Sequence, residues 1–239
     1  MEKLLLQKVA VVTGGTRGIG RAITERLLRE GASVVFCGRS EETVRSAARE
    51  LEKEAGEKVF GAVADVSDPK AVSRLFAQVD ERYGALHILI NNAGIGIFRR
   101  VSDLTLEDWR QTLDLNLSGV FYCSREALQR FNNGGGGYII NISSLAGKNA
   151  FSGGSAYNAS KFGLSGFTEA MMLDTRYENV RVSEIMPGSV ATEFGSGRSS
   201  SEGWKIAASD VAEVVVDLLR MPERTLVSGV EMRPSKPKK

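Results

Sequence analysis

The sequence predicts an α/β fold: a single doubly wound domain, residues 1–239, in which helices flank both faces of a seven-stranded parallel sheet. Apolar, β-branched segments alternate with segments of helical periodicity along the chain, which is typical of strand–helix–strand units. The chain of 239 residues is 42% hydrophobic, which supports one large core, and it shows no internal repeat or linker. Strands are expected near 7–13, 32–37, 58–64, 86–91, 137–143, 180–186 and 226–232, and helices near 18–30, 40–55, 69–83, 105–131, 156–178 and 209–221.

The first expected strand leads into a glycine-rich turn. Residues 8–12 form an apolar, β-branched run, glycines follow at positions 14, 18 and 20, and helical spacing begins at Arg21. Gly14 would permit a tight turn, while Gly18 and Gly20 would let backbone N–H groups and the helix N-terminus approach a pyrophosphate. The spacing is G-x3-G-x-G rather than G-x-G-x-x-G, and an ordinary strand-to-helix turn without a ligand remains the alternative for this motif alone.

The end of the second expected strand favours NADP(H) over NAD(H). An enzyme that uses NAD places an acidic side chain there, where it holds the ribose 2′-hydroxyl. Gly38 stands at that position, so no carboxylate would repel a 2′-phosphate, and Arg39 follows it. A guanidinium binds phosphate through forked donors, and Arg17 in the glycine turn could reach the same phosphate from the other side. Either arginine alone is also typical of an ordinary solvent-exposed position.

Polar residues follow the fourth and fifth expected strands. Asn91-Asn92-Ala93-Gly94 ends the fourth strand, and Ser143-Ser144 ends the fifth. Because ligands of an open parallel sheet bind beyond the carboxyl ends of its strands, these groups should meet at one edge with the glycine turn. Between the two strands, Thr105 and Asp108 form a capping-box-like helix start, and the glycine-rich run 132–137 is expected to be a connector because no helix follows it directly.

The helix near 156–178 carries Tyr157 and Lys161, which lie one turn apart on the same face. A free tyrosine has a pKa near 10, and an ammonium within a few Å favours the phenolate and lowers that pKa. A tyrosine so tuned can give a proton to a carbonyl oxygen or take one from an alcohol near neutral pH. A surface Tyr–Lys pair is the alternative for this motif alone. Together with the glycine turn, the pair indicates hydride chemistry on a carbonyl or an alcohol.

The chain resembles the short-chain dehydrogenases/reductases over essentially its full length. The family pattern T-G-x3-G-x-G matches residues 13–20, N-N-A-G matches 91–94, and Y-x-x-x-K matches 157–161. The family serine lies thirteen residues before the tyrosine, at Ser144, and the catalytic asparagine matches Asn116. The stretch P-G-x3-T matches Pro187, Gly188 and Thr192.

The resemblance implies a Rossmann-type domain and a role for each matched residue. Tyr157 would be the general acid/base and Ser144 would hydrogen-bond the substrate oxygen. Lys161 would lower the tyrosine pKa and bind the nicotinamide ribose, and Asn116 would hold a proton-relaying water. Asp65 resembles the aspartate that contacts adenine. With the two arginines above, the expected NADP(H)-binding residues are Gly14, Thr16, Arg17, Gly18, Ile19, Gly20, Arg39, Asp65, Val66, Asn92, Ala93, Gly94, Tyr157, Lys161, Pro187, Gly188, Val190 and Thr192.

The substrate is the least determined feature. The irregular stretch 193–207 is rich in Gly and Ser and stands where the family carries a substrate lid. A small-molecule carbonyl or alcohol of apolar or mixed character is expected. An anionic substrate or an acidic acyl carrier protein is the alternative, through basic residues at the pocket mouth. The candidate pocket walls are Ile97, Phe98, Leu145, Phe151, Phe194 and Trp204, and the basic residues are Arg99, Arg100, Lys148 and Arg198.

Two other functions stay open. One is 3-oxoacyl-acyl-carrier-protein reductase, although residues 227–234 depart from the glycine-rich ending of typical members. The other is a dinucleotide-binding sensor without turnover, which the intact set of motifs disfavours. The long helices 105–131 and 156–178 resemble those that pair in family oligomers, so a homodimer or homotetramer is expected.

Composition excludes several classes of function. The net charge of +2 implies no nucleic-acid partner, and the basic tail at 236–239 reads as a solvated terminus. Cys37 and Cys123 are not closely spaced and His87 is the only histidine, so no metal site is expected. No apolar run reaches the ~20 residues of a membrane span, and no signal peptide precedes the first strand. A cytoplasmic enzyme without membrane contact is expected.

Overall fold

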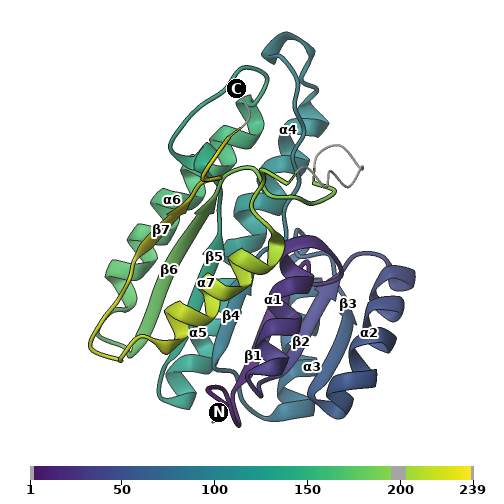
Figure 1. The fold of residues 1–239 in the computed structure, drawn as a ribbon, viewed down its shortest axis with the longest axis vertical. Coiled ribbons are helices and arrows are strands. Elements are labelled where there is room, and N and C mark those ends of the chain that lie inside the picture. Colours follow the sequence, from purple (N-terminus) through teal and green to yellow (C-terminus); the bar gives the residue numbers. More distant parts are fainter. Residues whose placement is uncertain (1–2, 195–202, 238–239) are drawn as a thin grey trace.

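The computed structural model describes residues 3–194 and 203–237, and these form one seven-stranded sheet with helices on both faces (Figure 1). The strand order is β3-β2-β1-β4-β5-β6-β7, and every pairing is parallel. The predicted doubly wound parallel sheet is therefore confirmed. The strands are β1 (Val9–Thr13), β2 (Ser33–Gly38), β3 (Val59–Val63), β4 (Ile88–Asn91), β5 (Gly137–Ile142), β6 (Val180–Pro187) and β7 (Gly229–Met232).

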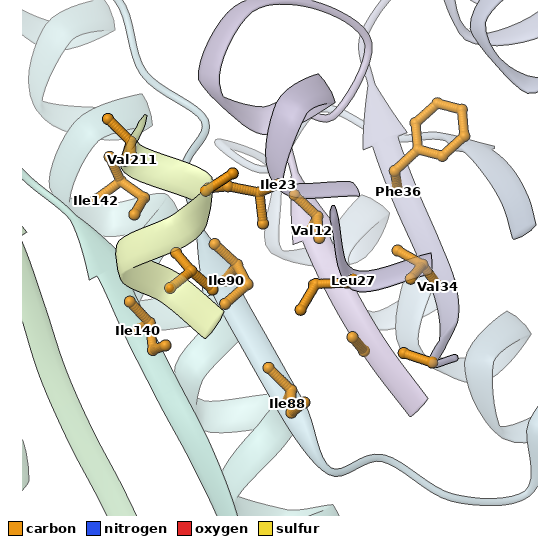
Figure 2. Packing of buried hydrophobic residues seen from close by; sticks show 14 of the residues in the cluster. Val12, Ile23, Leu27, Val34, Phe36, Ile88, Ile90, Ile140, Ile142 and Val211 are labelled. Carbon is orange, nitrogen blue, oxygen red and sulfur yellow. The ribbon is translucent and has the colours of Figure 1, made fainter. Parts of the chain in front are cut away.

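The strands alternate their side chains between two hydrophobic cores. Along β1, Ala10 and Val12 belong to one core, whereas Val9 and Val11 belong to the other. Because side chains of a strand point alternately to opposite faces, a strand covered on both sides is apolar throughout. Figure 2 shows the first core, in which Ile23 and Leu27 of helix α1 (Gly18–Arg29) pack on the sheet beside Val211 of α7 (Ala208–Arg220).

Three helices line each core. The first core contains residues of α1, α2 (Glu41–Ala55) and α7. The second contains residues of α3 (Pro69–Tyr83), α5 (Gly119–Gly134) and α6 (Ser155–Thr175). Several helices begin at side-chain caps: Ser40 accepts from the backbone of Thr43, Asp68 caps α3, and Thr105 with Asp108 forms the expected capping box of α4 (Leu106–Leu113).

The helix predicted over 105–131 is present as an unbroken helical stretch from Leu106 to Gly134, but a π-helical turn that was not predicted lies inside it. Three segments occupy this stretch: α4, a π-helical turn η3 (Asp114–Ser118), and α5. A π-turn takes one extra residue into the helical turn, so it changes which side chains face the sheet without ending the helix. Asn116 lies in this turn and is fully buried. Of the glycine-rich run 132–137, only Gly135 and Gly136 connect the two elements, because α5 extends to Gly134 and β5 begins at Gly137; Gly135 ends α5 in the left-handed conformation with φ +84°.

The remaining boundaries differ slightly from expectation. The helix expected over 156–178 ends at Thr175, and the last strand begins at Gly229 rather than near residue 226. The expected lid, 193–207, is described only at its two ends, because residues 195–202 lie outside the described part of the chain. Within the described ranges, no helix combines the length and the apolar character needed to cross a membrane.

Candidate active site

The glycine turn between β1 and α1 interlocks with the motif after β4. Thr13 Oγ1 accepts hydrogen bonds from the backbone N–H groups of Asn92 and Ala93, at 3.0 Å each. The Asn92 side chain donates back to the carbonyl oxygens of Thr13 (2.9 Å) and Gly14 (3.1 Å). A Cβ at Gly20 would collide with the Gly14 carbonyl oxygen and with this same Asn92 amide. Glycine is therefore required at position 20 to let the turn close on helix α1.

The start of α1 fits the phosphates of a dinucleotide. Its N-cap residue, Arg17, makes no side-chain capping bond, and its first turn contains no acidic residue. The first N–H groups of a helix lack intrahelical partners and carry a partial positive charge, so an uncapped N-terminus without acids accepts an anion. Gly14 and Gly18 have positive φ angles of 65° and 56°, as the turn requires.

The residues expected to select NADP(H) lie around the end of β2. A Cβ at Gly38 would lie 2.8 Å from Thr16 Cγ2, so Thr16 packs directly on this glycine. Arg39 is exposed and forms no ion pair with another residue of the described ranges. Arg17 Nη1 lies 2.8 Å from Glu193 Oε2, an ion pair that no local sequence pattern indicates. Asp65 Oδ1 accepts from the backbone N–H (3.0 Å) and hydroxyl (2.7 Å) of Ser67, so this side chain shapes the turn after β3.

Tyr157 and Lys161 lie buried on α6, with relative exposures of 7% and 5%. The Ser144 side chain lies near the Tyr157 hydroxyl and acts to lower its pKa. Burial nevertheless raises the pKa of Tyr157, and Ser144 only partly opposes this effect. The expectation that Lys161 lowers the tyrosine pKa is not met in this structure. Instead, Lys161 Nζ donates to the Ile142 carbonyl oxygen at 3.0 Å and lies 5.9 Å from the centre of the tyrosine ring.

Lys161 is itself strongly affected by its surroundings. Burial lowers its pKa to about 8, and the charge of Glu184 on β6 opposes this shift. Glu184 is 7% exposed, and its Oε1 accepts a 2.6 Å hydrogen bond from Ser165 Oγ. A buried carboxylate thus lies behind the lysine, and it favours the ammonium form.

Asn116 connects the motif after β4 with helix α6. Its Oδ1 accepts from the Ile95 N–H at 2.8 Å, and its Nδ2 donates to the Ile95 carbonyl oxygen (2.9 Å) and to Ser160 Oγ (3.0 Å). Ser160 Oγ in turn donates to the Tyr157 carbonyl oxygen at 2.7 Å. A Cβ at Gly94 would lie 3.2 Å from Asn116 Oδ1. Asn116 therefore fixes the position of the tyrosine-bearing helix relative to the β4 edge.

Three phenylalanines surround Tyr157 on its accessible side. The Phe98 ring lies 5.6 Å from those of Phe151 and Tyr157, and the Phe194 ring lies 5.8 Å from Tyr157. A Cβ at Gly96 would meet both Phe98 and Phe194, so these two rings meet above this glycine. Each phenylalanine is 46% exposed. They form a half-open aromatic wall beside the tyrosine ring, with Phe151 joined to it through Phe98.

The other expected wall residues lie differently. Leu145 lies against Gly188, where a Cβ would come within 3.1 Å of Leu145 Cδ1. Trp204 is partly buried, and Lys205 Nζ lies 5.6 Å from its ring centre. Val190, just before the expected lid, pairs with Ile206 near its end in an isolated β-bridge. Ile97 is partly buried.

Two of the four basic residues expected at the mouth form ion pairs with acids. Arg99 Nε lies 3.1 Å from Asp108 Oδ2, and Lys148 Nζ lies 2.7 Å from Glu231 Oε1. Arg100 is exposed, and Arg198 lies outside the described residues. Pairing reduces the positive field that an anionic substrate would meet at this mouth.

Comparison with known proteins decides the family. A family model described as short chain dehydrogenase matches residues 8–203. The chain belongs to the short-chain dehydrogenases. A 3beta-hydroxysteroid dehydrogenase of Mediterraneibacter gnavus is 37% identical over 224 residues, covering 93% of this chain and 80% of the relative.

Two solved structures are similar over nearly the whole chain. An alcohol dehydrogenase from the archaeon Thermococcus sibiricus, complexed with 5-hydroxy-NADP, gives a TM-score of 0.90 at 29% identity, covering 97% of this chain and 99% of that one. A metagenomic short-chain oxidoreductase in complex with NADP gives 0.85 at 34% identity, covering 98% and 100%. The chain is therefore an oxidoreductase of this family.

Sequence reasoning missed several residues that shape this short-chain dehydrogenase site. Asn158, inside the Y-x-x-x-K motif, donates to the carbonyl oxygens of Ala146 (2.7 Å) and Asn149 (3.2 Å) and so holds the segment between β5 and α6. The one feature of the sequence that could have pointed to Asn158 is its position next to Tyr157. No feature of the sequence pointed to Glu184 or Glu193, because an acid in a strand or loop can be identified as part of a site only once its partner in the folded protein is known. Ser143 Oγ is buried without a hydrogen-bond partner among the described residues.

Proposed function

We propose that this short-chain dehydrogenase transfers a hydride between NADP(H) and a carbonyl or secondary alcohol of an apolar small molecule, with Tyr157 as general acid/base. The observation that carries the proposal is the buried Tyr157, which lies near Ser144 and is flanked by a half-open aromatic wall. When bound, the nicotinamide supplies the hydride for reduction or accepts it in oxidation. Residues of this chain position the substrate and transfer the proton.

In the reductive direction, the substrate carbonyl oxygen lies between Ser144 and Tyr157. Ser144 donates a hydrogen bond to it, and Tyr157 transfers its hydroxyl proton to the oxygen as the carbonyl carbon gains the hydride. A raised pKa keeps Tyr157 in its phenol form, which is the form that donates a proton. Lys161 then stabilises the phenolate that remains, and proton transfer from solvent restores the phenol. From the family resemblance, we assign to Asn116 a bound water that relays this proton from solvent to Lys161.

NADP(H) is the proposed dinucleotide. Gly38 leaves no carboxylate at the end of β2, and Arg39 is exposed beside it. Arg17 stands at the uncapped start of α1. Two similar structures are described as complexes with NADP or 5-hydroxy-NADP, which supports the same choice here. The remaining proposed contacts are those expected from the sequence, from Gly14 to Thr192.

The proposed substrate is a rigid, uncharged cyclic ketone or the matching alcohol. Phe98, Phe151 and Phe194 offer flat apolar surface beside the tyrosine, and such surface binds a rigid apolar ring system at low entropic cost. The relative from Mediterraneibacter gnavus is named for a hydroxysteroid, which is a compound of this kind. A 3-oxoacyl carrier-protein reductase is less well supported, because Arg99 and Lys148 are paired.

The assembly and compartment are also proposed. We expect a homodimer or homotetramer through α5 and α6, whose outer surfaces expose Phe121 and Leu173. Cys37 and Cys123 are both free and buried, which suits a reducing compartment such as the cytoplasm.

Oxidation of NADPH by the purified protein tests the proposal. The carbonyl panel contains 3-ketosteroids, monocyclic ketones, linear ketones and 3-oxoacyl thioesters. Cyclic ketones should be reduced with the highest kcat/KM. Fastest turnover of the thioesters would favour the carrier-protein alternative, and tight NADPH binding without turnover of any member would favour the sensor.

Substitution of the tyrosine tests the mechanism. Tyr157→Phe should keep the fold and dinucleotide binding but lower kcat by about two to four orders of magnitude, the usual scale for a lost general acid. Tyr177→Phe, which makes the same change at a tyrosine that is 92% exposed, is the matched control and should leave kcat unchanged. A Tyr157→Phe variant with a tenth or more of the wild-type kcat, with chemistry rate-limiting, would rule out this role.

A further inference from the structure

Three consecutive residues after β6 each contact a different part of the site. Thr192 lies against Gly18 of the glycine turn, where a Cβ would come within 3.4 Å of Thr192 Cγ2. Glu193 pairs with Arg17 at 2.8 Å, and the Phe194 ring lies 5.8 Å from that of Tyr157. The run 192–194 therefore spans from the phosphate-binding turn to the catalytic tyrosine.

The base of this run is anchored by backbone hydrogen bonds. The Ala191 N–H donates to the Ile206 carbonyl oxygen at 2.8 Å, and the Thr192 N–H donates to the Val190 carbonyl oxygen at 2.9 Å. The Phe194 N–H donates to Thr192 Oγ1 at 3.3 Å. Glu193 is thus presented to Arg17 by a tethered segment. The two residues stand 176 positions apart in the chain, so the fold alone creates the pair.

The pair places a carboxylate where an anionic ligand is expected. Arg17 is the N-cap residue of α1, whose first turn contains no acid of its own. Glu193 is therefore an anion contributed from outside to the positive end of this helix. The Arg17 and Glu193 side chains are 74% and 47% exposed, so a ligand can reach the guanidinium and displace the carboxylate.

We propose that Glu193 competes with the 2′-phosphate of NADP(H) for Arg17, and that it thereby sets how strongly the site prefers the phosphorylated dinucleotide. The inference rests on the proposed NADP(H) preference and adds a residue that acts against it. A phosphate that takes Arg17 must first break the pair with Glu193, so the affinity for NADP(H) is reduced. A dinucleotide without the phosphate leaves the pair intact, so its affinity is independent of Glu193.

The expected effect is modest because the pair is exposed. Exposed ion pairs contribute little to stability, so removing this one should tighten NADPH binding by about two- to fivefold. The effect should shrink as ionic strength rises, since salt screens exposed charges. It should also depend on Arg17, because the carboxylate acts through that guanidinium.

The test is calorimetric titration of Glu193→Gln with NADPH, NADH, 2′-AMP and 5′-AMP at low salt. The variant should bind NADPH and 2′-AMP about two- to fivefold more tightly than the wild type, and NADH and 5′-AMP with unchanged Kd. Glu223→Gln is the matched control, because it makes the same charge change at an exposed position beyond the end of α7. In an Arg17→Ala background, Glu193→Gln should have no effect. Thermal unfolding checks that each variant is folded.

Several outcomes would overturn the inference. Unchanged NADPH binding in Glu193→Gln would show that the carboxylate does not compete. Weaker binding of both dinucleotides would show that Glu193 instead supports the site by holding the run 192–194. The proposed NADP(H) preference fails separately, when the wild type binds NADH as tightly as NADPH. If the wild type prefers NADPH and Glu193→Gln binds NADPH with the same Kd as the wild type, the inference about Glu193 is refuted while the proposed NADP(H) preference stands.

Discussion

Lys161 has to remain charged while it is buried. Burial lowers its pKa from 10.5 to about 8, with Glu184 as the opposing charge. Below about pH 8 the folded protein carries this ammonium at a desolvation cost. Between about pH 8 and 10.5 the unfolded chain binds the proton and the folded protein does not. Stability therefore rises with pH through that window as far as this residue is concerned.

Lys161→Met should be more stable than the wild type at pH 7 and inactive. Removing the buried charge stabilises the fold by on the order of 3 kcal/mol. Losing the hydrogen bond to the Ile142 carbonyl oxygen destabilises it by about 1 kcal/mol. The net gain in the free energy of unfolding should be about 2 kcal/mol at pH 7, and it should fall towards zero near pH 10. Denaturant titrations at both pH values measure it. A variant less stable than the wild type at pH 7 would contradict this account of the lysine.

Arg39 provides a second prediction at the scale of one residue. Arg39→Ala should weaken NADPH binding by about ten- to a hundredfold, the scale of one charge-assisted hydrogen bond, and leave NADH nearly unchanged. Kd values for both dinucleotides measure it, with Arg45→Ala on the outer surface of α2 as control. An acid introduced at Gly38 would be a poorer test, because a Cβ there comes within 2.8 Å of Thr16. Equal effects on the two dinucleotides would refute phosphate recognition by Arg39.

Residue types and spacing predicted that the motif of Asn92 would meet the glycine turn at one edge of the sheet, and the Asn92 side chain bonds the Thr13 and Gly14 carbonyl oxygens there. They did not predict the direction of the Tyr157 pKa shift. That direction depends on how fully the hydroxyl is buried, which becomes known only after folding. The Arg17–Glu193 pair was hidden for a similar reason, since no local pattern connects residues so distant in the chain.

At the scale of elements, the central strands β1 and β4 could be predicted because parallel strands covered on both faces are apolar throughout, whereas β7 is partly exposed and its predicted start was less accurate. The π-turn η3 could not be predicted, because one extra residue barely disturbs the helical periodicity of the sequence around it. The turn nevertheless carries Asn116, so the largest error in the predicted elements fell at a functional residue.

The aromatic wall depends on the segment between β4 and α4, which carries Phe98. Phe98→Ala should raise KM for cyclic ketones about two- to tenfold and leave kcat largely unchanged, because the ring offers contact area rather than chemistry. Leu6→Ala, which truncates an exposed apolar side chain outside the site, is the matched control. Initial rates across a ketone series measure the effect. A fall in kcat with unchanged KM would instead place Phe98 in the positioning of Tyr157.

On the scale of the whole molecule, the helices do not bury all of their apolar surface. Phe121 on α5 is 46% exposed, and Leu173 on α6 is 51% exposed. A hollow between the two helices is lined by apolar and charged side chains, including Leu128, Phe167 and Arg125. Exposed apolar area gathered over two neighbouring helices is typical of a protein interface. The same pair of helices was expected to mediate oligomers from the sequence resemblance.

Phe121→Glu should therefore convert the protein to monomers. The Phe121 ring lies 5.7 Å from that of Tyr122 and 6.2 Å from that of Phe167, so a carboxylate there would be placed on an apolar surface and desolvated by a second copy. Light scattering after gel filtration should give a dimer or tetramer for the wild type and a monomer for the variant, with Leu6→Glu as control. A monomeric wild type, or a variant of unchanged mass, would exclude this face. Tyr157 and Lys161 also lie on α6 but are buried within the protomer, so loss of the partner should lower the melting temperature more than it lowers kcat at 25 °C.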